Sequence, residues 1–222
     1  MIAKITNKIR RLSIYYEKQG LWGLFKHIFT NLVHYNKWII FEGDVIAEHV
    51  VAEAKIPVTI RLASQSEEDI DKLAELWPKD YAPPFSTPQS VRELISELLR
   101  DGEKCMVAEH RGEIIHMNWM GFHDTHRYHP YERKRKLKPH EVLSYYSYCS
   151  VNYRGNSLMG AVRSKIFDYL VENNYKNIIS YVMPGNTASI KVNTRFLGKP
   201  ALLVRFWNIL GFNFSLLSRK RS

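Results

Sequence analysis

Polar residues that could bind an anion stand between a predicted strand and a predicted helix. The strand is Glu141–Ser150, a run of Tyr, Ser, Val, Leu and Cys without Pro or Gly. A polar turn, Asn152–Ser157, follows it, and apolar residues at helical spacing begin at Leu158. The first N–H groups of a helix have no partner within the helix, and the helix dipole adds positive potential there. We therefore expect a phosphorylated ligand at Arg154–Leu158.

A second polar motif follows the next predicted strand, Asn177–Met183. Pro184 and Gly185 turn the chain after that strand, and Asn186 is a residue type that caps helices. The pattern predicts a short helix from Asn186 to about Phe196.

The remaining pattern predicts the elements that position these two motifs. They are a strand at 57–62, helices at 67–77 and 88–101, a hairpin at 104–122 with a polar insertion at 121–140, and strands at 201–207 and 212–217. Pro78 ends the first helix, and Thr87 with Pro88 begins the second. This order predicts a mixed α/β sheet whose first half is antiparallel and whose second half is βαβ-like.

The first forty residues differ from the rest of the chain. Residues 2–16 and 21–35 each place an apolar stripe on a predicted helix, and residues 1–38 carry seven basic residues against one acidic residue. Two interpretations stand side by side: an anchor lying in an anionic membrane surface, or helices that pack on protein. We divide the chain into an extension at 1–42 and a domain at 43–222.

Composition limits the classes of partner and compartment. The 222 residues carry a net charge of +10, which favours anionic partners such as nucleotides, nucleic acid or an acidic membrane. Cys105 and Cys149 fit neither a disulfide framework nor a metal site, so we expect reduced thiols in a cytoplasmic protein. No signal peptide and no apolar run of about 18 residues is visible.

The two motifs, in this order of elements, resemble those of the GCN5-related N-acetyltransferase (GNAT) superfamily over about residues 56–214. The superfamily's phosphate loop reads Arg/Gln-x-x-Gly-x-Gly/Ala. Arg154 and Gly155 match the form of it that begins Arg-Gly, whereas Ser157 stands where the next Gly is usual and Met159 where Gly or Ala is usual. The resemblance implies a GNAT-like α/β fold with a mixed, mostly antiparallel sheet and flanking helices, plus the N-terminal amphipathic helical extension.

The second signature of the superfamily is an Asn after the following strand, a small residue three positions later and often a Tyr four beyond that. Asn186 and Ser189 match the first two positions, and Asn193 occupies the Tyr position. In the family that Tyr commonly protonates the leaving thiolate. Asn193 can form hydrogen bonds there but cannot act as an acid, so another donor, such as Tyr153 or solvent, is needed.

The resemblance implies that acetyl-CoA is the acyl donor and that no metal is needed. The cofactor-binding residues would be Cys149, Val151, Arg154, Gly155, Asn156, Ser157, Leu158, Asn186 and Ser189. The strand at Tyr148–Val151 would splay from its neighbour and free backbone groups for the pantetheine arm. The N–H of Val151 would bond the thioester carbonyl and stabilise the oxyanion.

Three residues are candidates for the catalytic steps: Tyr145, Ser147 and Asn193. Side chains at 145, 147 and 149 share one face of a regular strand. Tyr145 or Ser147 could therefore orient a water molecule that takes the proton of the amine, although each residue taken alone is better explained as a half-buried strand residue. The general base stays open at this point.

Three functions compete. The first is acyl-CoA-dependent N-acyltransfer, with acetyl transfer to a primary amine such as an amino sugar or a cell-surface polysaccharide precursor. The alternative is a non-catalytic module that binds acyl-CoA or docks on a membrane or partner through residues 1–38, and a nucleic-acid binder ranks last. His123, His126 and His129 have metal-like spacing but are better explained as a polar loop over the acceptor site. A homodimer is compatible with the sequence.

Overall fold

The computed structural model describes residues 20–22, 33–78, 87–122, 125–127, 134–209 and 212–219. The helix expected at 2–16 and most of the helix expected at 21–35 lie outside these ranges. Membrane anchoring through residues 1–38 therefore stays a prediction. A homodimer and a cytoplasmic location also stay predictions. Within the described ranges, every helix is too short or too polar to cross a lipid bilayer.

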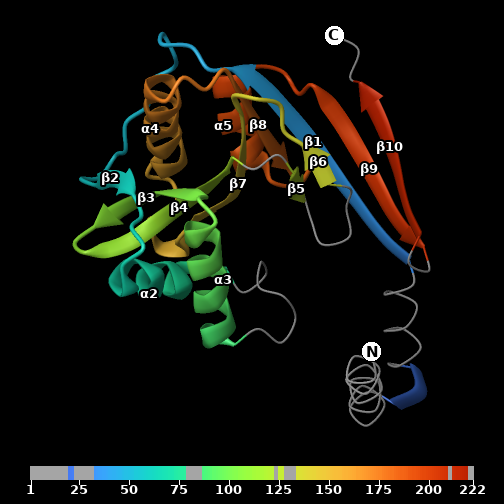
Figure 1. Ribbon diagram of the computed structural model, residues 1–222, viewed down its shortest axis with the longest axis horizontal. Helices are drawn as coiled ribbons and strands as arrows, with labels where there is room; N and C mark the ends of the chain where they lie inside the picture. The colour runs from blue at the N-terminus through green and yellow to red at the C-terminus, as the bar shows by residue number, and fades with distance from the viewer. Residues whose placement is uncertain are drawn as a thin grey trace.

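A single eight-stranded sheet organises the chain (Figure 1). Its order is β10-β9-β1-β8-β7-β4-β3-β2, and every neighbouring pair is antiparallel except β7 and β8. The strands are β1 (Val33–Asp44), β2 (Thr59–Leu62), β3 (Lys104–His110), β4 (Glu113–Gly121), β7 (Glu141–Cys149), β8 (Asn177–Val182), β9 (Leu202–Ile209) and β10 (Phe212–Arg219). The predicted mixed, mostly antiparallel α/β fold is confirmed.

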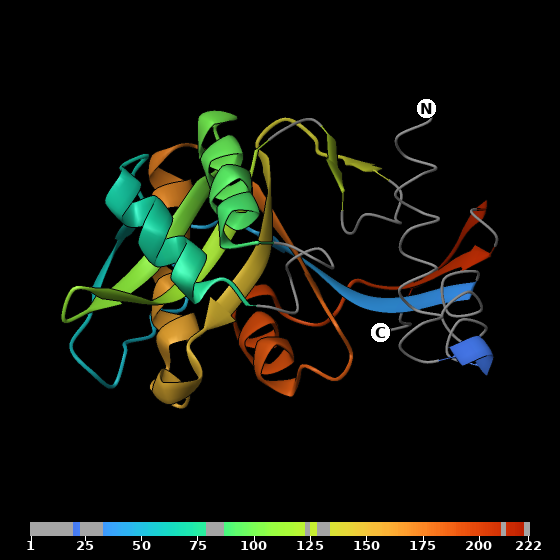
Figure 2. The ribbon, with the colours of Figure 1, turned by 90° about the horizontal axis from the view of Figure 1, so that it is seen from below.

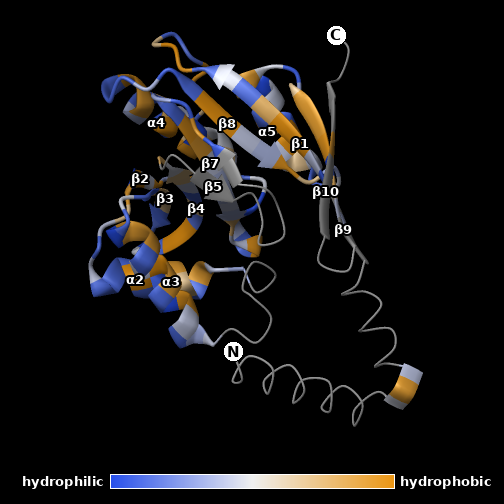
Figure 3. Cartoon of the chain, turned by 45° about the vertical axis from the view of Figure 1, so that its right-hand side comes forward, coloured by the Kyte–Doolittle hydropathy of each residue, from blue (hydrophilic) through white to orange (hydrophobic). Residues whose placement is uncertain are grey.

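Two pairs of helices cover the two faces of this sheet (Figures 1 and 3). One core cluster joins the sheet to α2 (Glu67–Leu76) and α3 (Pro88–Arg100). The other joins it to α4 (Leu158–Glu172) and α5 (Thr187–Leu197). The three layers bury apolar side chains on both sheet faces, which is why the central strands are apolar along most of their length.

The predicted helix starts are confirmed by their caps. The hydroxyl of Ser66 accepts a hydrogen bond from the Asp69 N–H at 3.2 Å and begins α2. Thr87 and Ser90 form a reciprocal capping box that begins α3. The polar insertion also contains a small hairpin, in which β5 (Thr125–Arg127) pairs with β6 (Lys134–Lys136).

The structure corrects the domain boundary at residue 42, because that residue lies inside β1. β1 pairs with β8 on one side and with β9 on the other, so residues 33–42 belong to the same sheet as the rest of the domain. Its inner residues are buried: Phe41 is 0% exposed and Ile40 is 2% exposed. A Cβ added at Gly43 would lie 3.2 Å from the Leu197 Cα, so β1 also packs closely against α5.

β1, β9 and β10 extend beyond the helical layers (Figure 2). β8 pairs only with Ile39–Asp44 of β1, whereas β9 pairs with Val33–Ile40. The first part of β1 therefore continues past the end of β8 as part of a three-stranded arm. The helix expected at 21–35 is corrected at its end, since Val33 already belongs to the strand.

Candidate functional site

The two central strands separate where the sequence places the anion site. β7 pairs with β8 only from Glu141 to Ser144, although it continues to Cys149. Beyond that point β8 pairs only with β1, through Tyr181 and Val182. The last five residues of β7 therefore have a free edge toward β8, and this opening supplies room for a ligand between two parallel strands.

A β-bulge in β7 decides which side chains face this opening. The register with β4 shifts between Met117 and Trp119, and Tyr146 has a positive φ of 43°. A bulge breaks the alternation of side chains along a strand. Tyr145 consequently packs in the core cluster beneath α2 and α3, whereas Ser147 lines the opening. The expectation that the two share a face is wrong, and Tyr145 is not placed to act on a ligand there.

A cavity of about 830 Å³ occupies the opening. It extends from the loop before α4, past the free edge of β7, to Pro78 at the end of α2. The predicted residues that line it are Ser147, Cys149, Arg154, Gly155, Ser157, Leu158, Asn186 and Ser189. The two motifs that are separate in sequence thus form one cavity.

The loop at the start of α4 is shaped to leave backbone N–H groups open. Gly155 and Ser157 both have positive φ angles, 85° and 57°. Ser157 is the N-cap of α4, yet its side chain makes no capping hydrogen bond. The first N–H groups of α4 therefore have no side-chain partner, which is the condition for binding an anion at a helix N-terminus.

Replacing Ser157 by Gly should stabilise the protein. A side chain in the left-handed region costs about 1–2 kcal/mol, of which the greater freedom of unfolded glycine cancels part, so we expect a gain of about 0.5–1 kcal/mol. Urea unfolding measures it. Ser150→Gly is the control, because Ser150 has a φ of −50° and makes no capping bond. It should lose stability, and equal effects of the two substitutions would contradict this account.

The cavity is electropositive. Arg154, Lys191 and Arg195 line it, and the described lining residues include no carboxylate. Arg154 is held by the wall, since its Nε donates to the Cys149 carbonyl at 3.4 Å and its guanidinium lies 5.9 Å from the centre of the Tyr148 ring. Three positive side chains around a helix N-terminus favour a ligand with more than one negative charge.

The free edge of β7 also offers a hydrogen-bond donor. Ser150 donates its N–H to the Ile115 carbonyl of β4 at 2.9 Å. Because successive N–H groups of a strand point to opposite edges, the N–H of Cys149 points to the side where β8 has moved away. Burial raises the pKa of the Cys149 thiol, so its side chain is neutral at physiological pH.

Four predicted site residues lie outside the cavity lining. Tyr145 is in the core, and Val151 is 63% exposed in the short 3-10 turn Val151–Tyr153. Asn156 is occupied within the loop, where its Nδ2 donates to the Tyr153 carbonyl at 3.1 Å. Asn193 is 1% exposed, and its Nδ2 donates to the Ser189 carbonyl at 2.8 Å. Asn193 also lies against Arg163 of α4, whose Nη2 is 3.4 Å from the Asn193 Oδ1.

The sequence motifs did not single out His116 or Arg163. His116 of β4 lines the cavity and is 1% exposed, and Arg163 of α4 is also 1% exposed. Burial and the nearby charge of Arg163 lower the pKa of His116 to about 3, so the imidazole is neutral. A charged residue within the apolar face of a predicted helix was the available signal, because Arg163 follows Val162 and precedes Ile166.

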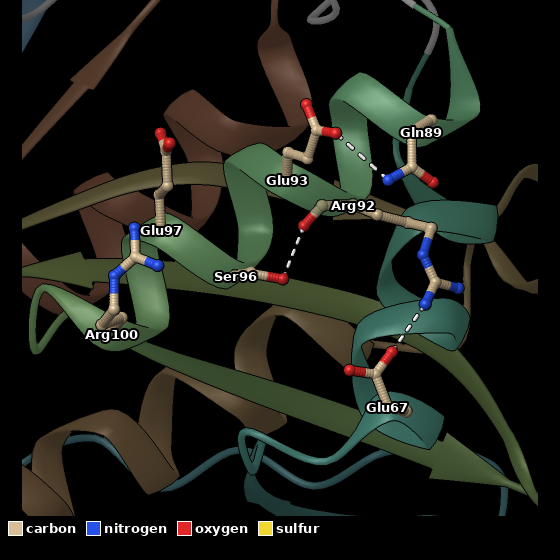
Figure 4. A pocket seen from close by; sticks show the side chains of 7 residues that line it. All are labelled: Glu67, Gln89, Arg92, Glu93, Ser96, Glu97 and Arg100. Atoms are coloured by element: carbon tan, nitrogen blue, oxygen red, sulfur yellow. Dashed lines mark hydrogen bonds and ion pairs between the residues drawn. The ribbon is translucent and has the colours of Figure 1, made fainter.

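A second, shallower depression lies on the outer side of α3 (Figure 4). Within it Arg92 pairs with Glu67 at 2.6 Å, and Gln89 donates to Glu93 at 3.1 Å. It holds none of the predicted site residues. Among the described residues, no three His, Cys, Asp or Glu side chains gather as metal ligands would.

The fold and the open strand pair define the GNAT class of α/β fold. No family model matches the sequence, and no curated protein matches it. Solved structures do match. A tandem GNAT protein from the clavulanic acid biosynthesis pathway has a TM-score of 0.57 at 14% identity, over 86% of this chain and 58% of its own. A protein assigned to the GNAT acetyltransferases from Novosphingobium aromaticivorans has a TM-score of 0.51 at 13% identity, over 85% and 66%.

These two likenesses show that the chain has the GNAT fold, as its motifs predicted. An N-acetyltransferase from Staphylococcus aureus is also similar, with a TM-score of 0.48 at 17% identity over 63% of this chain and 81% of its own. At these sequence identities the likenesses define the fold, and they define neither the reaction nor the substrates.

Proposed function

We propose that the protein is an acyl-CoA-dependent N-acyltransferase that transfers an acetyl group to a primary amine. The observation that carries this proposal is the single cavity that joins an uncapped helix N-terminus to a free strand edge. The helix N-terminus suits an anion, and the strand edge suits an extended arm with amide groups. Coenzyme A has both parts, a diphosphate and a pantetheine arm. Few other ligands need both parts in this order.

The loop would bind the diphosphate of acetyl-CoA. The N–H groups at the start of α4 would donate to its oxygens, and Arg154, Lys191 and Arg195 would offset its charge. The pantetheine arm would then follow the free edge of β7 toward Ser147. The N–H of Cys149 points to the free edge of β7, so we favour it over the N–H of Val151 as the donor to a carbonyl of the arm or of the thioester.

The acyl transfer needs a neutral amine beside the thioester. The amine nitrogen attacks the thioester carbon, a C–N bond forms, and the C–S bond breaks with its electron pair on sulfur. One proton leaves the nitrogen and one is finally taken up by the thiolate. Ser147 lines the cavity near its β7 end and would orient the water molecule that accepts the amine proton.

The acceptor would enter from the end of the cavity at Pro78. We propose an amino sugar or a related precursor of a surface polysaccharide, carried on an anionic group. The net charge of +10 and the basic strand β6 (Lys134–Lys136) support an anionic carrier. The amine itself must be neutral to react, so transfer should be faster above neutral pH for an alkylamine.

Acetyl-CoA should raise the thermal stability of the full chain. At a hundredfold excess over its Kd, a ligand stabilises by about 2.7 kcal/mol, which corresponds to several degrees in Tm. Arg154→Gln should weaken the shift, whereas Arg100→Gln, in the depression on the outer side of α3, should leave it unchanged. Release of free thiol with a panel of amines tests catalysis. A Tm shift without thiol release on any amine would favour a non-catalytic acyl-CoA-binding module instead.

A further inference from the structure

A buried histidine faces the cavity without a hydrogen-bond partner. His116 is 1% exposed and lines the cavity, and neither of its ring nitrogens has a partner among the described residues. It lies directly across the strand pair from Cys149, whose N–H points to the free edge of β7. A buried imidazole without a partner is costly, because its desolvation is not repaid by a protein contact.

A buried arginine acts on this histidine through its charge. Arg163 is 1% exposed, and its Nε and Nη1 have no partner among the described residues. Its Nη2 lies 3.4 Å from the Asn193 Oδ1, which is a weak contact for a guanidinium. Burial lowers the pKa of Arg163 to about 10, so the group remains charged at neutral pH. The charge has no carboxylate opposite it within the described structure.

Together these side chains have more donors than acceptors. The free nitrogens of Arg163 offer three N–H bonds, and neutral His116 offers one N–H and one acceptor nitrogen. A cluster of this kind calls for an acceptor atom that carries negative charge. Water satisfies it poorly, because each water molecule brings two further donors into the same space.

The cluster lies beside the position at which this chain lacks the Tyr of the family motif. Asn193 stands where GNAT proteins often carry the Tyr that protonates the leaving thiolate, and Asn193 is the side chain that Arg163 approaches. The diphosphate loop closes the other end of the cavity. The reactive end of a donor would therefore lie toward Ser147, Cys149 and His116.

We propose that His116 and Arg163 form the leaving-group subsite of the transfer reaction, in which the imidazole N–H donates to the sulfur and the guanidinium charge stabilises it. This inference rests on the proposed function. His116 is the catalytic residue, because it lines the cavity. Arg163 lies outside the lining and is a positioning residue, because its charge acts on the sulfur by polarising the imidazole N–H. As the C–S bond breaks, its electron pair stays on sulfur as a thiolate. His116 keeps its proton and only shares it in the hydrogen bond, and the proton that the thiolate finally takes is the one lost by the amine.

The thiol of bound coenzyme A reports directly on this subsite. We would saturate the full chain with coenzyme A and titrate the bound thiol by the ultraviolet absorbance of the thiolate. The absorbance of a complex with desulfo-coenzyme A, which lacks the sulfur, is subtracted to remove the contribution of the Cys105 and Cys149 thiols. The charged and titratable groups that line the cavity are Tyr148 and Cys149 on β7, His116 on β4, Tyr153 and Arg154 before α4, and Lys191 and Arg195 on α5. Arg163 on α4 lies outside the lining, and its charge acts on His116.

In the wild-type complex the bound thiol should titrate at least one pH unit below free coenzyme A, a tenfold higher thiolate fraction at a given pH. Arg163→Met and His116→Leu should each remove most of that shift. His116→Gln should keep part of it, because the amide retains an N–H donor. Lys191→Gln is the control: it also removes one positive charge from the cavity, but at α5, and should weaken binding of coenzyme A while leaving the thiol titration unchanged.

The possible failures are distinct. Binding of coenzyme A with a thiol that titrates as it does in solution would overturn the leaving-group subsite and leave the proposed acyl-CoA function standing. The subsite would also be overturned if Lys191→Gln changed the pKa of the bound thiol as much as Arg163→Met does. Any positive charge near the cavity would then be enough to lower that pKa. If neither coenzyme A nor acetyl-CoA binds, the proposed function itself is overturned, and the subsite with it.

Discussion

Phe41→Ala should lower the free energy of unfolding by about 3–5 kcal/mol, which removes much of the stability of a typical domain. Phe41 is 0% exposed and packs in the core cluster beneath α4 and α5. Truncation would leave a cavity between β1 and the helices, because the strand is held on both edges and cannot move inward to fill it. Urea unfolding followed by circular dichroism measures the change.

Tyr35→Ala in the same strand is the matched control. Tyr35 is 49% exposed and contacts Trp207 at a ring distance of 5.4 Å, so its truncation should cost about 1 kcal/mol or less. If Phe41→Ala proved as mild as Tyr35→Ala, β1 would be an accessory strand, and the domain boundary predicted from the sequence at residue 42 would stand.

Arg163→Met should make the ligand-free protein more stable and the enzyme slower. The substitution replaces an uncompensated buried charge by an apolar side chain of similar length. Replacing buried ionic groups by well-packed apolar side chains can stabilise by about 1–4 kcal/mol. On the subsite proposed above, the same change removes the charge that favours thiolate departure, and kcat should fall about tenfold or more. Thermal unfolding without ligand and steady-state acetyl transfer measure the two effects.

The opposite signs of these two effects are the informative part. A residue that served packing alone would lose stability and activity together. Arg163→Lys provides the comparison, because it keeps a positive charge but loses the planar group that approaches Asn193. It should gain little stability and retain more turnover than Arg163→Met. A fall in the stability of Arg163→Met would show that the guanidinium is compensated in the protein.

Local signals made most of the fold and half of the site predictable. The helix starts at Ser66, Thr87 and Asn186 follow from side chains that bond an N–H three residues further on. The anion loop follows from a strand, a polar turn and an apolar helix in immediate succession. Its left-handed Ser157 keeps the backbone shape although the expected Gly is missing.

Tertiary effects account for what the sequence did not predict. The bulge at Tyr146 depends on how β7 meets β4, and it alone separates Tyr145 from Ser147. His116 and Arg163 lie 47 positions apart in the sequence, and they interact only when α4 packs over β4. β1 has ordinary strand composition, and nothing near it in the sequence shows that it inserts between β8 and β9.

That insertion has a consequence for how the chain reaches its native state. β1 is synthesised long before its partners, Asn177–Val182 and Leu202–Ile209, because most of the other strands of the sheet lie between them in the sequence. The sheet therefore cannot close across its middle until β8 and β9 have been synthesised. Pairings between such distant segments slow folding and keep apolar strand edges exposed meanwhile. The growing chain should depend on chaperones for longer than a domain whose first strand lies at the edge of its sheet.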